Sequence, residues 1–218
     1  MKKIYQISIG LFSFVILMSF SSMAQTLAFH KGSLLVSLSE GHTAGSYSTT
    51  DDSHTTKKHC NGDRDPIIIE YGLSNRWSIG LTSGNDIFKV NPSEFYGFHT
   101  STNSVKASTG EVTVDGNYHV FVNKRLDLSV VASLGMFSVT IKGNDKDYFY
   151  NYTSTGNIIR VGTRVRYYFA KRFGVFGMIS SYSGVCSTKN VKGNTVGNNY
   201  STTITGAAVE MGLCYRFF

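Results

Sequence analysis

The sequence predicts an all-β fold, an eight-stranded antiparallel up-and-down transmembrane β-barrel preceded by a cleavable signal peptide. Three observations predict it. Apolar residues recur at every second position, short and long connections alternate along the chain, and only 16% of the 218 residues are charged. Average soluble domains have about a quarter of their residues charged. We therefore expect much of the surface of the folded protein to lie outside water, where charged side chains are not needed for solubility.

The N-terminus has the pattern of a signal peptide. Two lysines precede an apolar stretch over residues 7–20, and the small residues Ser22 and Ala24 follow it as at a cleavage site. The apolar stretch is short for a helix that spans a bilayer. We therefore expect residues 1–24 to be removed and residues 25–218 to form one outer-membrane β-barrel domain.

Strict alternation of apolar and polar residues marks eight candidate strands. The strongest alternation covers residues 112–122, 126–136, 159–169 and 207–217, and weaker versions cover 34–38, 67–73, 77–81 and 173–179. Several of these strands are close to ten residues long, which is the length that a tilted strand needs to cross a bilayer.

The connections between these strands are of two kinds. Short turns are expected at residues 74–76, 123–125 and 170–172, whereas long polar loops rich in Ser, Thr, Asn and Gly are expected at 40–64, 84–110, 140–156 and 184–201. The two kinds alternate, so the chain forms four hairpins with both termini on the short-turn side. A closed sheet explains this repeat more simply than a solenoid does.

Alternation alone does not say whether the apolar face points into a core or into lipid, and a soluble lipocalin-like barrel has a similar pattern. The signal peptide, the unequal connections and the aromatic residues near strand ends favour lipid. Near the short turns these aromatic residues are Tyr71, Trp77, Tyr167, Phe169, Phe173, Tyr215 and Phe217. Toward the long loops they are Phe88, Phe95, Tyr96, Phe137, Tyr148 and Tyr182.

The last strand carries the most specific motif. Leu213, Tyr215 and Phe217 alternate up to the final residue, Phe218. This ending resembles the C-terminal insertion signal of bacterial outer-membrane barrels. The mature chain is similar to the small eight-stranded family of OmpX-like proteins and OmpA transmembrane domains. The resemblance implies insertion by the outer-membrane assembly machinery, a location in the bacterial cell outer membrane and periplasmic termini.

The parity of the strands places charged residues inside the predicted barrel. The expected interior charge network consists of Glu70, Asp115, His119, Arg160, Arg164, Arg166, Glu210 and Arg216. Eight strands leave room for little more than side chains, and unpaired buried charges are costly. We expect these residues to form a structural plug of salt bridges rather than a selective path or a binding cavity.

Catalytic and metal-binding patterns are weak in this sequence. His119 is the only histidine within a clear strand, and its parity places it inside, whereas a lipid-cleaving triad has to face the membrane or the outer rim. The first long loop combines His42, His54, His59, Asp51, Asp52 and Cys60. These ligand types suit zinc, but their spacing is not that of a zinc site. We expect no catalytic residue, no metal and no cofactor.

Cys60 and Cys186 lie in neighbouring loops, so a disulfide between them stays open as an alternative.

The sequence favours a non-enzymatic outer-membrane protein with a structural or surface-interaction role through four long loops. A narrow porin or transporter for small solutes is the alternative, and a lipid A-modifying enzyme is the third. Expected partners are outer-membrane lipids, lipopolysaccharide and a surface ligand or host-cell partner, with no nucleic acid, and we expect a monomer.

Four lysines in the expected loops are candidates for binding the phosphates of lipopolysaccharide: Lys142, Lys146, Lys189 and Lys192. Tyr148, Phe149, Tyr150 and Tyr152 form an aromatic patch that either binds a partner or extends the outer girdle, and exposed strand edges offer β-augmentation.

Overall fold

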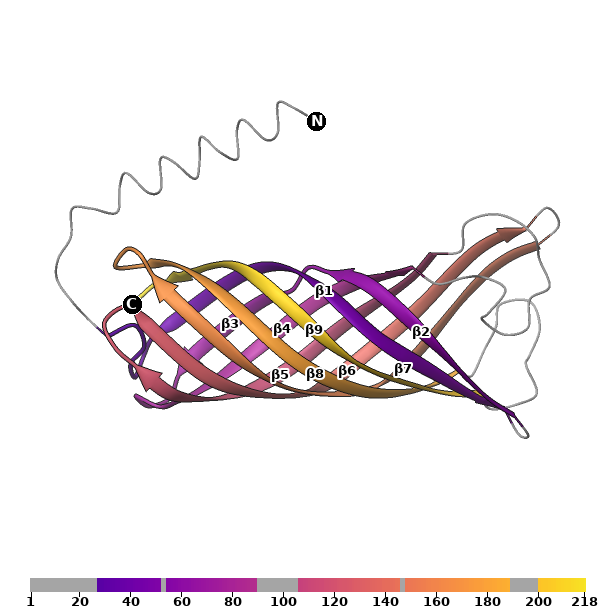
Figure 1. The fold of residues 1–218 in the computed structure, drawn as a ribbon, viewed down its shortest axis with the longest axis horizontal. Coiled ribbons are helices and arrows are strands. Elements are labelled where there is room, and N and C mark those ends of the chain that lie inside the picture. The colour runs from indigo at the N-terminus through magenta and orange to yellow at the C-terminus, as the bar shows by residue number, and fades with distance from the viewer. Residues whose placement is uncertain (1–26, 52–53, 90–105, 146–147, 189–199) are drawn as a thin grey trace, which may run out of the picture.

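The structure is a computed structural model that describes residues 27–51, 54–89, 106–145, 148–188 and 200–218 (Figure 1). The regular elements of these residues are all β-strands. Within the described ranges, no helix is long and apolar enough to cross a membrane. The predicted signal peptide at residues 1–24 lies outside the described residues.

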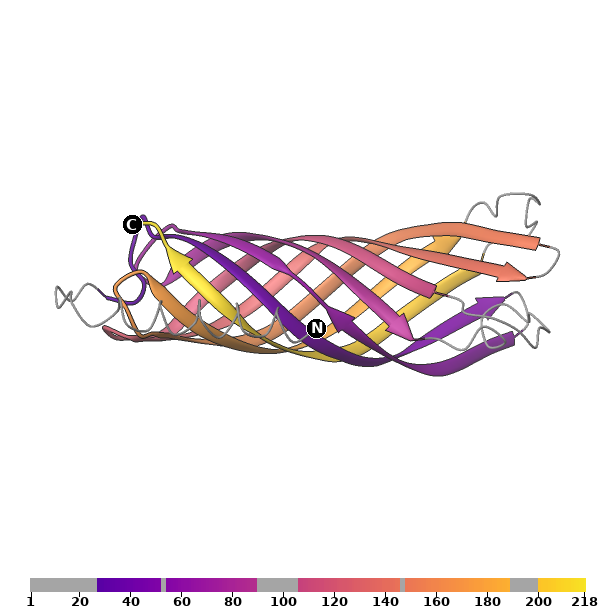
Figure 2. The same ribbon diagram turned by 90° about the horizontal axis from the view of Figure 1, so that it is seen from above.

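The strands form one antiparallel sheet in chain order, and β9 pairs with β1 to close it. They are β1 (Leu34–Asp51), β2 (His54–Arg64), β3 (Ile67–Gly72), β4 (Trp77–Lys89), β5 (Lys106–Val122), β6 (Leu126–Asp145), β7 (Tyr148–Tyr168), β8 (Phe173–Thr188) and β9 (Tyr200–Arg216). Figures 1 and 2 show the resulting closed barrel from two sides.

Two of the nine strands occupy a single position in the barrel wall. Both β2 and β3 pair with β1 on one side and with β4 on the other. They are separated by Asp65 and Pro66, and proline interrupts a ladder because it has no N–H to donate. The wall therefore has eight strand positions, and the predicted eight-stranded up-and-down barrel is confirmed.

The strands are staggered around the barrel. The register pairs that start at Leu38 lead once around the wall to Ser48, which lies ten residues further along β1. Such a stagger tilts the strands by about 40° from the barrel axis. Residues that are far apart in sequence therefore meet at the same level of the lumen.

One end of the barrel, here called the turn end, carries the tight turns. Local hydrogen bonds fix them: the Asn123 side-chain oxygen accepts the N–H groups of Arg125 and Leu126 at 2.8 and 2.7 Å, and Ser74 Oγ accepts that of Trp77 at 3.0 Å. The C-terminus lies at this end (Figure 1). The opposite end is called the hairpin end.

Two of the expected long polar loops, at residues 40–64 and 140–156, are strands in their described residues, so the prediction was wrong for these two. Residues 90–105 and 189–199 of the other two expected loops lie outside the described residues. The β1–β2 and β6–β7 ladders run as far as the pairs Asp51↔His54 and Asp145↔Tyr148. Both hairpins reach beyond the rest of the barrel (Figures 1 and 2). The apolar alternation fades where the strands leave an apolar environment, but backbone pairing continues because it does not depend on side-chain polarity.

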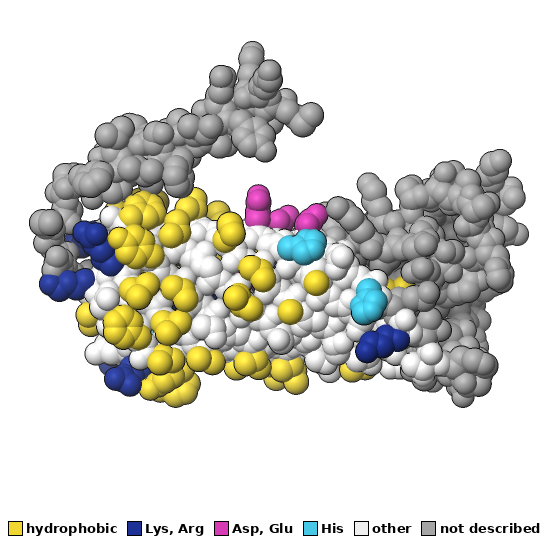
Figure 3. Space-filling view, viewed as in Figure 1, with side chains coloured by type: hydrophobic (Ala, Val, Ile, Leu, Met, Phe, Trp, Pro, Cys, Tyr) yellow, Lys and Arg dark blue, Asp and Glu magenta, His cyan; other side chains and the backbone are white. Residues whose placement is uncertain are grey.

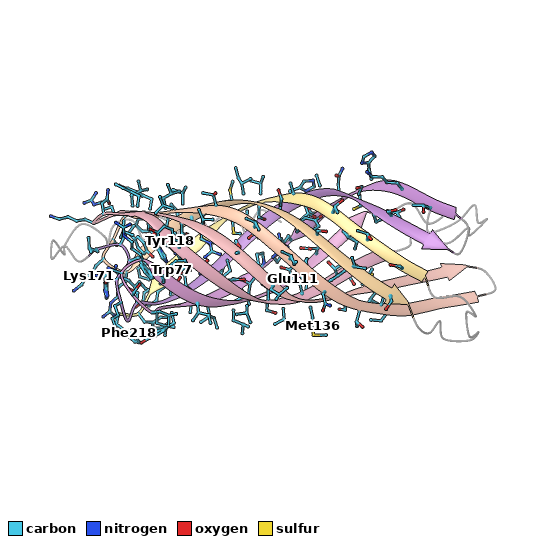
Figure 4. All side chains as sticks on the ribbon, turned by 90° about the horizontal axis from the view of Figure 1, so that it is seen from below. Trp77, Glu111, Tyr118, Met136, Lys171 and Phe218 are labelled. Atoms are coloured by element: carbon cyan, nitrogen blue, oxygen red, sulfur yellow. The ribbon has the colours of Figure 1, made fainter. Side chains whose placement is uncertain are left out.

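The two faces of the wall differ as parity predicts. Figure 4 shows Met136 projecting outward and Glu111 lying within the barrel. The exposed apolar side chains of the turn-end half are called the apolar belt. It includes Leu38, Ile67, Ile69, Ile79, Leu81, Val112, Val114, Val130, Leu134, Met136, Ile159, Val161, Val165, Val175, Ile179, Val209, Met211 and Leu213.

Only part of the expected aromatic arrangement is found. Tyr71, Trp77, Tyr167, Phe173 and Phe217 are exposed around the turn end. In contrast, Phe137 and Tyr182 are buried in the lumen, because they have the parity of the inward face. The prediction that these two residues belong to a second outer girdle was therefore wrong. Phe95 and Tyr96 lie outside the described residues, as do the side chains of Phe88 and Tyr148.

Candidate functional site

The lumen contains two groups of buried ion pairs. The turn-side cluster consists of Glu70, His119, Asp127, Arg164 and Arg166, and the hairpin-side cluster consists of Arg64, Asp86, Glu111, Arg160 and Glu210. All ten side chains are buried. The residues of the turn-side cluster come from four strands, β3, β5, β6 and β7, so the cluster forms only when these strands assemble into the barrel.

Glu70 on β3 is the centre of the turn-side cluster. Its Oε2 accepts from Arg164 Nη1 at 2.9 Å and from Arg166 Nη2, and its Oε1 lies 3.3 Å from Arg166 Nη1 and 3.2 Å from His119 Nε2. Arg166 also reaches Asp127 Oδ2 at 3.0 Å. A buried arginine fork is stable when carboxylates satisfy several of its donors at once.

A serine, a histidine and an aspartate meet in this cluster at the spacing of a catalytic triad. Ser78 Oγ lies 3.1 Å from His119 Nε2, and His119 Nδ1 lies 2.7 Å from Asp127 Oδ1. The hydroxyl hydrogen of Ser78 is directed to Glu70 Oε1 at 2.7 Å, and Asn117 Nδ2 donates to Ser78 Oγ at 3.0 Å. Both ring nitrogens of His119 face carboxylates, which suits an imidazolium that donates twice.

This arrangement does not form an acyl-transfer site. A nucleophilic serine has to pass its proton to the histidine and needs a neighbouring oxyanion hole that a substrate can reach. Here Ser78 donates to a carboxylate, and its side chain is 3% exposed. The three residues therefore belong to a hydrogen-bonded ionic core, and their geometry is explained by a structural role rather than by catalysis.

The hairpin-side cluster is built around Arg64. Its Nη2 donates to Glu111 Oε1, its Nε lies 2.8 Å from Glu210 Oε1, and its Nη1 lies 3.4 Å from Asp86 Oδ1. Arg160 Nη2 approaches the other Glu111 oxygen at 2.8 Å. Two arginines thus hold three carboxylates, so this cluster crosses the lumen from β2 to β7.

Asp115 lies on β5 at a register position between the two clusters. Thr82 and Thr113 both donate hydroxyl hydrogens to its carboxylate, the latter at 3.0 Å. Hydroxyl donors of this kind stabilise a buried carboxylate where no arginine reaches it directly. Charged and polar side chains therefore continue from one cluster to the next.

The turn end of the lumen is closed by residues 27–33, called the N-terminal strap. Ala28 and Phe29 are fully buried, and the Phe29 ring stacks on His119 with centroids 3.5 Å apart. The Ala28 N–H donates to the Asn123 carbonyl at 2.7 Å. Gly32 has a φ of 83°, a conformation that favours glycine, and its N–H bonds the Gly72 carbonyl at 2.8 Å.

The structure places seven of the eight expected network residues in or between the two clusters. Arg216 instead lies at the turn end, where it donates to the backbone carbonyls of Leu27 and Lys171. Its guanidinium lies 5.3 Å from the centroid of the Tyr168 ring. Of the expected insertion-signal residues, Leu213 and Tyr215 lie near the end of β9, and Phe217 and Phe218 follow it. Tyr215 packs against Phe173 and Phe217 at centroid distances of 4.7 and 4.8 Å.

Sequence reasoning missed four members of the network, namely Arg64, Asp86, Glu111 and Asp127. Glu111 and Asp127 have inward parity in strands that were already expected, so extending the parity argument could have found them. Arg64 and Asp86 fall in segments expected to be loops. The strap was also missed, although the apolar Leu27–Phe29 segment after the cleavage site was a signal for it.

The cysteines and the histidines of the first predicted loop do not form a metal site in the described residues. Cys60 and Cys186 are free thiols on the hairpin-end sections of β2 and β8, and burial raises the pKa of each to about 11. His42 Nδ1 lies 3.2 Å from Asp63 Oδ1 on the exposed outer wall. No group of three or more His, Cys, Asp or Glu residues is placed to hold a metal ion in the part of the chain that is described.

No protein-family model and no curated protein matches this sequence. Solved structures do match. Outer membrane protein OprG from Pseudomonas aeruginosa has a TM-score of 0.53 at 11% sequence identity, over 86% of this chain and 97% of that chain. Outer membrane protein AlkL in DMPC lipid bilayers has a TM-score of 0.50 at 16% identity, over 90% and 95%. The chain therefore has the fold of the small outer-membrane β-barrels.

Proposed function

We propose that this protein is an integral outer-membrane barrel with a closed lumen, no enzymatic activity, and a structural or surface-interaction role performed by its hairpin end. The turn end then faces the periplasm and the hairpin end faces the outside of the cell. The apolar belt supports a membrane location. On β6 its outward run from Leu126 to Met136 is ten residue steps long, or about 25 Å high at about 3.3 Å per residue and about 40° tilt.

The observation that carries the closed lumen is the continuity of the ionic core. The turn-side and hairpin-side clusters fill successive levels of the barrel, and Phe29 covers the turn end. An eight-stranded barrel has an interior only wide enough for its own side chains. Ions that enter from either end would have to break several buried ion pairs at once, so steady conduction is not expected.

Conductance distinguishes a plugged barrel from a narrow porin. The folded protein would be inserted into planar bilayers at neutral pH, and we expect no steady single-channel steps. The variant Glu111→Ala with Arg160→Ala removes ions from the hairpin-side cluster but leaves the turn-side cluster and Phe29 in place, so it should also show no steady steps. An open porin inserted into the same bilayers shows that the assay detects an open lumen. Regular unitary steps from the unmodified protein, once contaminating porins are excluded, would contradict the closed lumen.

The surface-interaction role rests on the β6–β7 hairpin. The β7 pairing with β8 begins at Thr155↔Ser187, whereas the pairing with β6 continues to Tyr148↔Asp145. Among the described residues, the tip segment of β7 therefore pairs on one side only, and a foreign strand can add to such an edge. The aromatic side chains of this segment are not among the described ones, and neither are the side chains of the four lysines proposed to meet lipopolysaccharide phosphates.

Shortening the β6–β7 hairpin tests this role, and an analysis of lipid A tests the enzyme alternative. Cells that carry the full protein would be compared with cells in which residues 141–152 are replaced by a short Asn-Gly turn, which leaves the belt and the ionic core intact. We expect equal amounts of folded barrel but loss of surface adhesion in the shortened form. Mass spectrometry of lipid A from cells with and without the protein tests the enzyme alternative, and a protein-dependent change in acyl chains would favour it.

A further inference from the structure

Acidic side chains form a patch on the outer wall of the barrel. Side chains are described for nine Asp and Glu residues, of which six are buried in the lumen. The other three are exposed and lie together, namely Glu40, Asp63 and Asp65. Figure 3 shows magenta and cyan side chains gathered beside the yellow apolar ones along one edge of the barrel. The only exposed carboxylates with described side chains therefore share one place.

The register places this patch within the apolar belt. Glu40 pairs with Met211 and His42 pairs with Val209 across the closing seam between β1 and β9. Met211 is 70% exposed and Val209 is 52% exposed, so both face the surroundings of the barrel. A carboxylate at this level faces hydrocarbon, where a charge without a partner is unfavourable.

A groove lies directly below the patch. Its volume is about 510 Å³, and its apolar floor is formed by Leu38, Ile67, Met211 and Leu213. Glu40 and Asp65 line its rim. The groove arises where Pro66 interrupts the wall between β2 and β3, and its volume is in the range of small-molecule sites.

We propose that this groove binds a membrane amphiphile that has one alkyl chain and a positively charged amine head group. The floor matches an alkyl chain by its apolar surface, and the rim matches an ammonium group by its charge. An ammonium group has three donors and no acceptor, so it can bridge the two carboxylates of Glu40 and Asp65. Asp63 already has His42 as a partner at 3.2 Å and does not line the groove.

A second copy of the chain does not supply this complement. The exposed Lys and Arg side chains that the structure describes lie at the turn end, as the labelled Lys171 does in Figure 4, or on β2 near the hairpin end. None of these described cations lies in the belt. A barrel-to-barrel contact through the belt would therefore place Glu40 and Asp65 against apolar side chains.

Native mass spectrometry of the folded full-length barrel tests the inference. The probes are octadecylamine, octadecanol and octadecanoic acid, which share one chain and differ in head-group charge. We expect one retained octadecylamine per barrel, at about fivefold greater occupancy than octadecanol. The variant Glu40→Gln with Asp65→Asn should lower the amine to the level of the alcohol. The matched variant Asp63→Asn, which removes a neighbouring carboxylate outside the groove, should retain most of the amine.

Other outcomes overturn the inference. Equal retention of amine and alcohol, preferential retention of the acid, or an amine adduct unaffected by the double substitution would each exclude an amine site at the groove. A dimer that disappears in the double variant would assign the groove to a second copy. Because the inference rests on the belt lying in lipid, insertion into phosphatidylcholine vesicles is measured separately. Failure to insert would contradict the proposed membrane location, whereas insertion without amine selectivity would contradict only the inference.

Discussion

Replacing Glu70 by glutamine tests whether the ionic core holds the barrel together. Glu70 has contacts with Arg164, Arg166 and His119, and its side chain is 1% exposed. The substitution keeps the shape of the side chain but leaves the two guanidinium groups with less compensating charge. Removing one partner of a buried ion pair costs about 3–5 kcal/mol. We therefore expect Glu70→Gln to lower the free energy of unfolding by about 4 kcal/mol.

Urea unfolding in detergent micelles measures this change, with the heat-modifiable gel mobility of the folded barrel as the readout. At a slope of about 2 kcal/mol per molar urea, the midpoint should fall by about 2 M. The matched control is Lys171→Gln, which neutralises an exposed charge at the turn end, outside the apolar belt, and should change stability by no more than about 0.5 kcal/mol. Equal midpoints for Glu70→Gln and Lys171→Gln would refute the reasoning.

A second change separates charge pairing from packing. Combining Glu70→Gln with Arg164→Met removes one of the cations that the first substitution leaves unbalanced, and the linear side chain keeps the contact space. If the pair is coupled, the double variant should be more stable than the sum of the single effects by about 2 kcal/mol. Additive effects would show that Glu70 and Arg164 contribute independently.

Three further predictions concern the cysteines, the glycines of the wall and the N-terminal strap. Burial raises the pKa of the Cys60 and Cys186 thiols to about 11, so at pH 8 about one thiol in a thousand is ionised. Maleimide should label the folded barrel slowly and faster with rising pH, and rapid labelling at pH 8 would contradict their burial. Gly212→Ala introduces a methyl group against the β1 backbone and should lower the urea midpoint, whereas Gly177→Ala meets only ordinary contacts and should not. Phe29→Ala should cost about 3 kcal/mol and speed amide exchange in the turns, and unchanged exchange would argue against the strap as a closure.

Much of the site was predictable from parity. Arg160, Arg164 and Arg166 recur at even spacing among apolar residues, so local alternation alone places all three on one face of β7. Arg64 was not predictable in this way, because the polar composition of its segment resembles that of a loop. The amino-acid composition of a segment indicates whether it contacts lipid or water. Strand pairing depends instead on hydrogen bonds to the backbone of the neighbouring segment, so a polar segment can still be a strand.

The sequence by itself determined the strand parity, the tight turns and hence the eight-stranded barrel, because each follows from local contrasts between apolar and polar neighbours. Only the tertiary structure decided which charges meet. Glu70 contacts Arg164 and Arg166 over separations of 94 and 96 residues, and that meeting depends on the ten-residue stagger of the closed wall. A stagger is the sum of the registers of every strand pair, so no single segment encodes it. The strap over His119 and the acidic groove beside Pro66 likewise arise only when distant strands close into one wall.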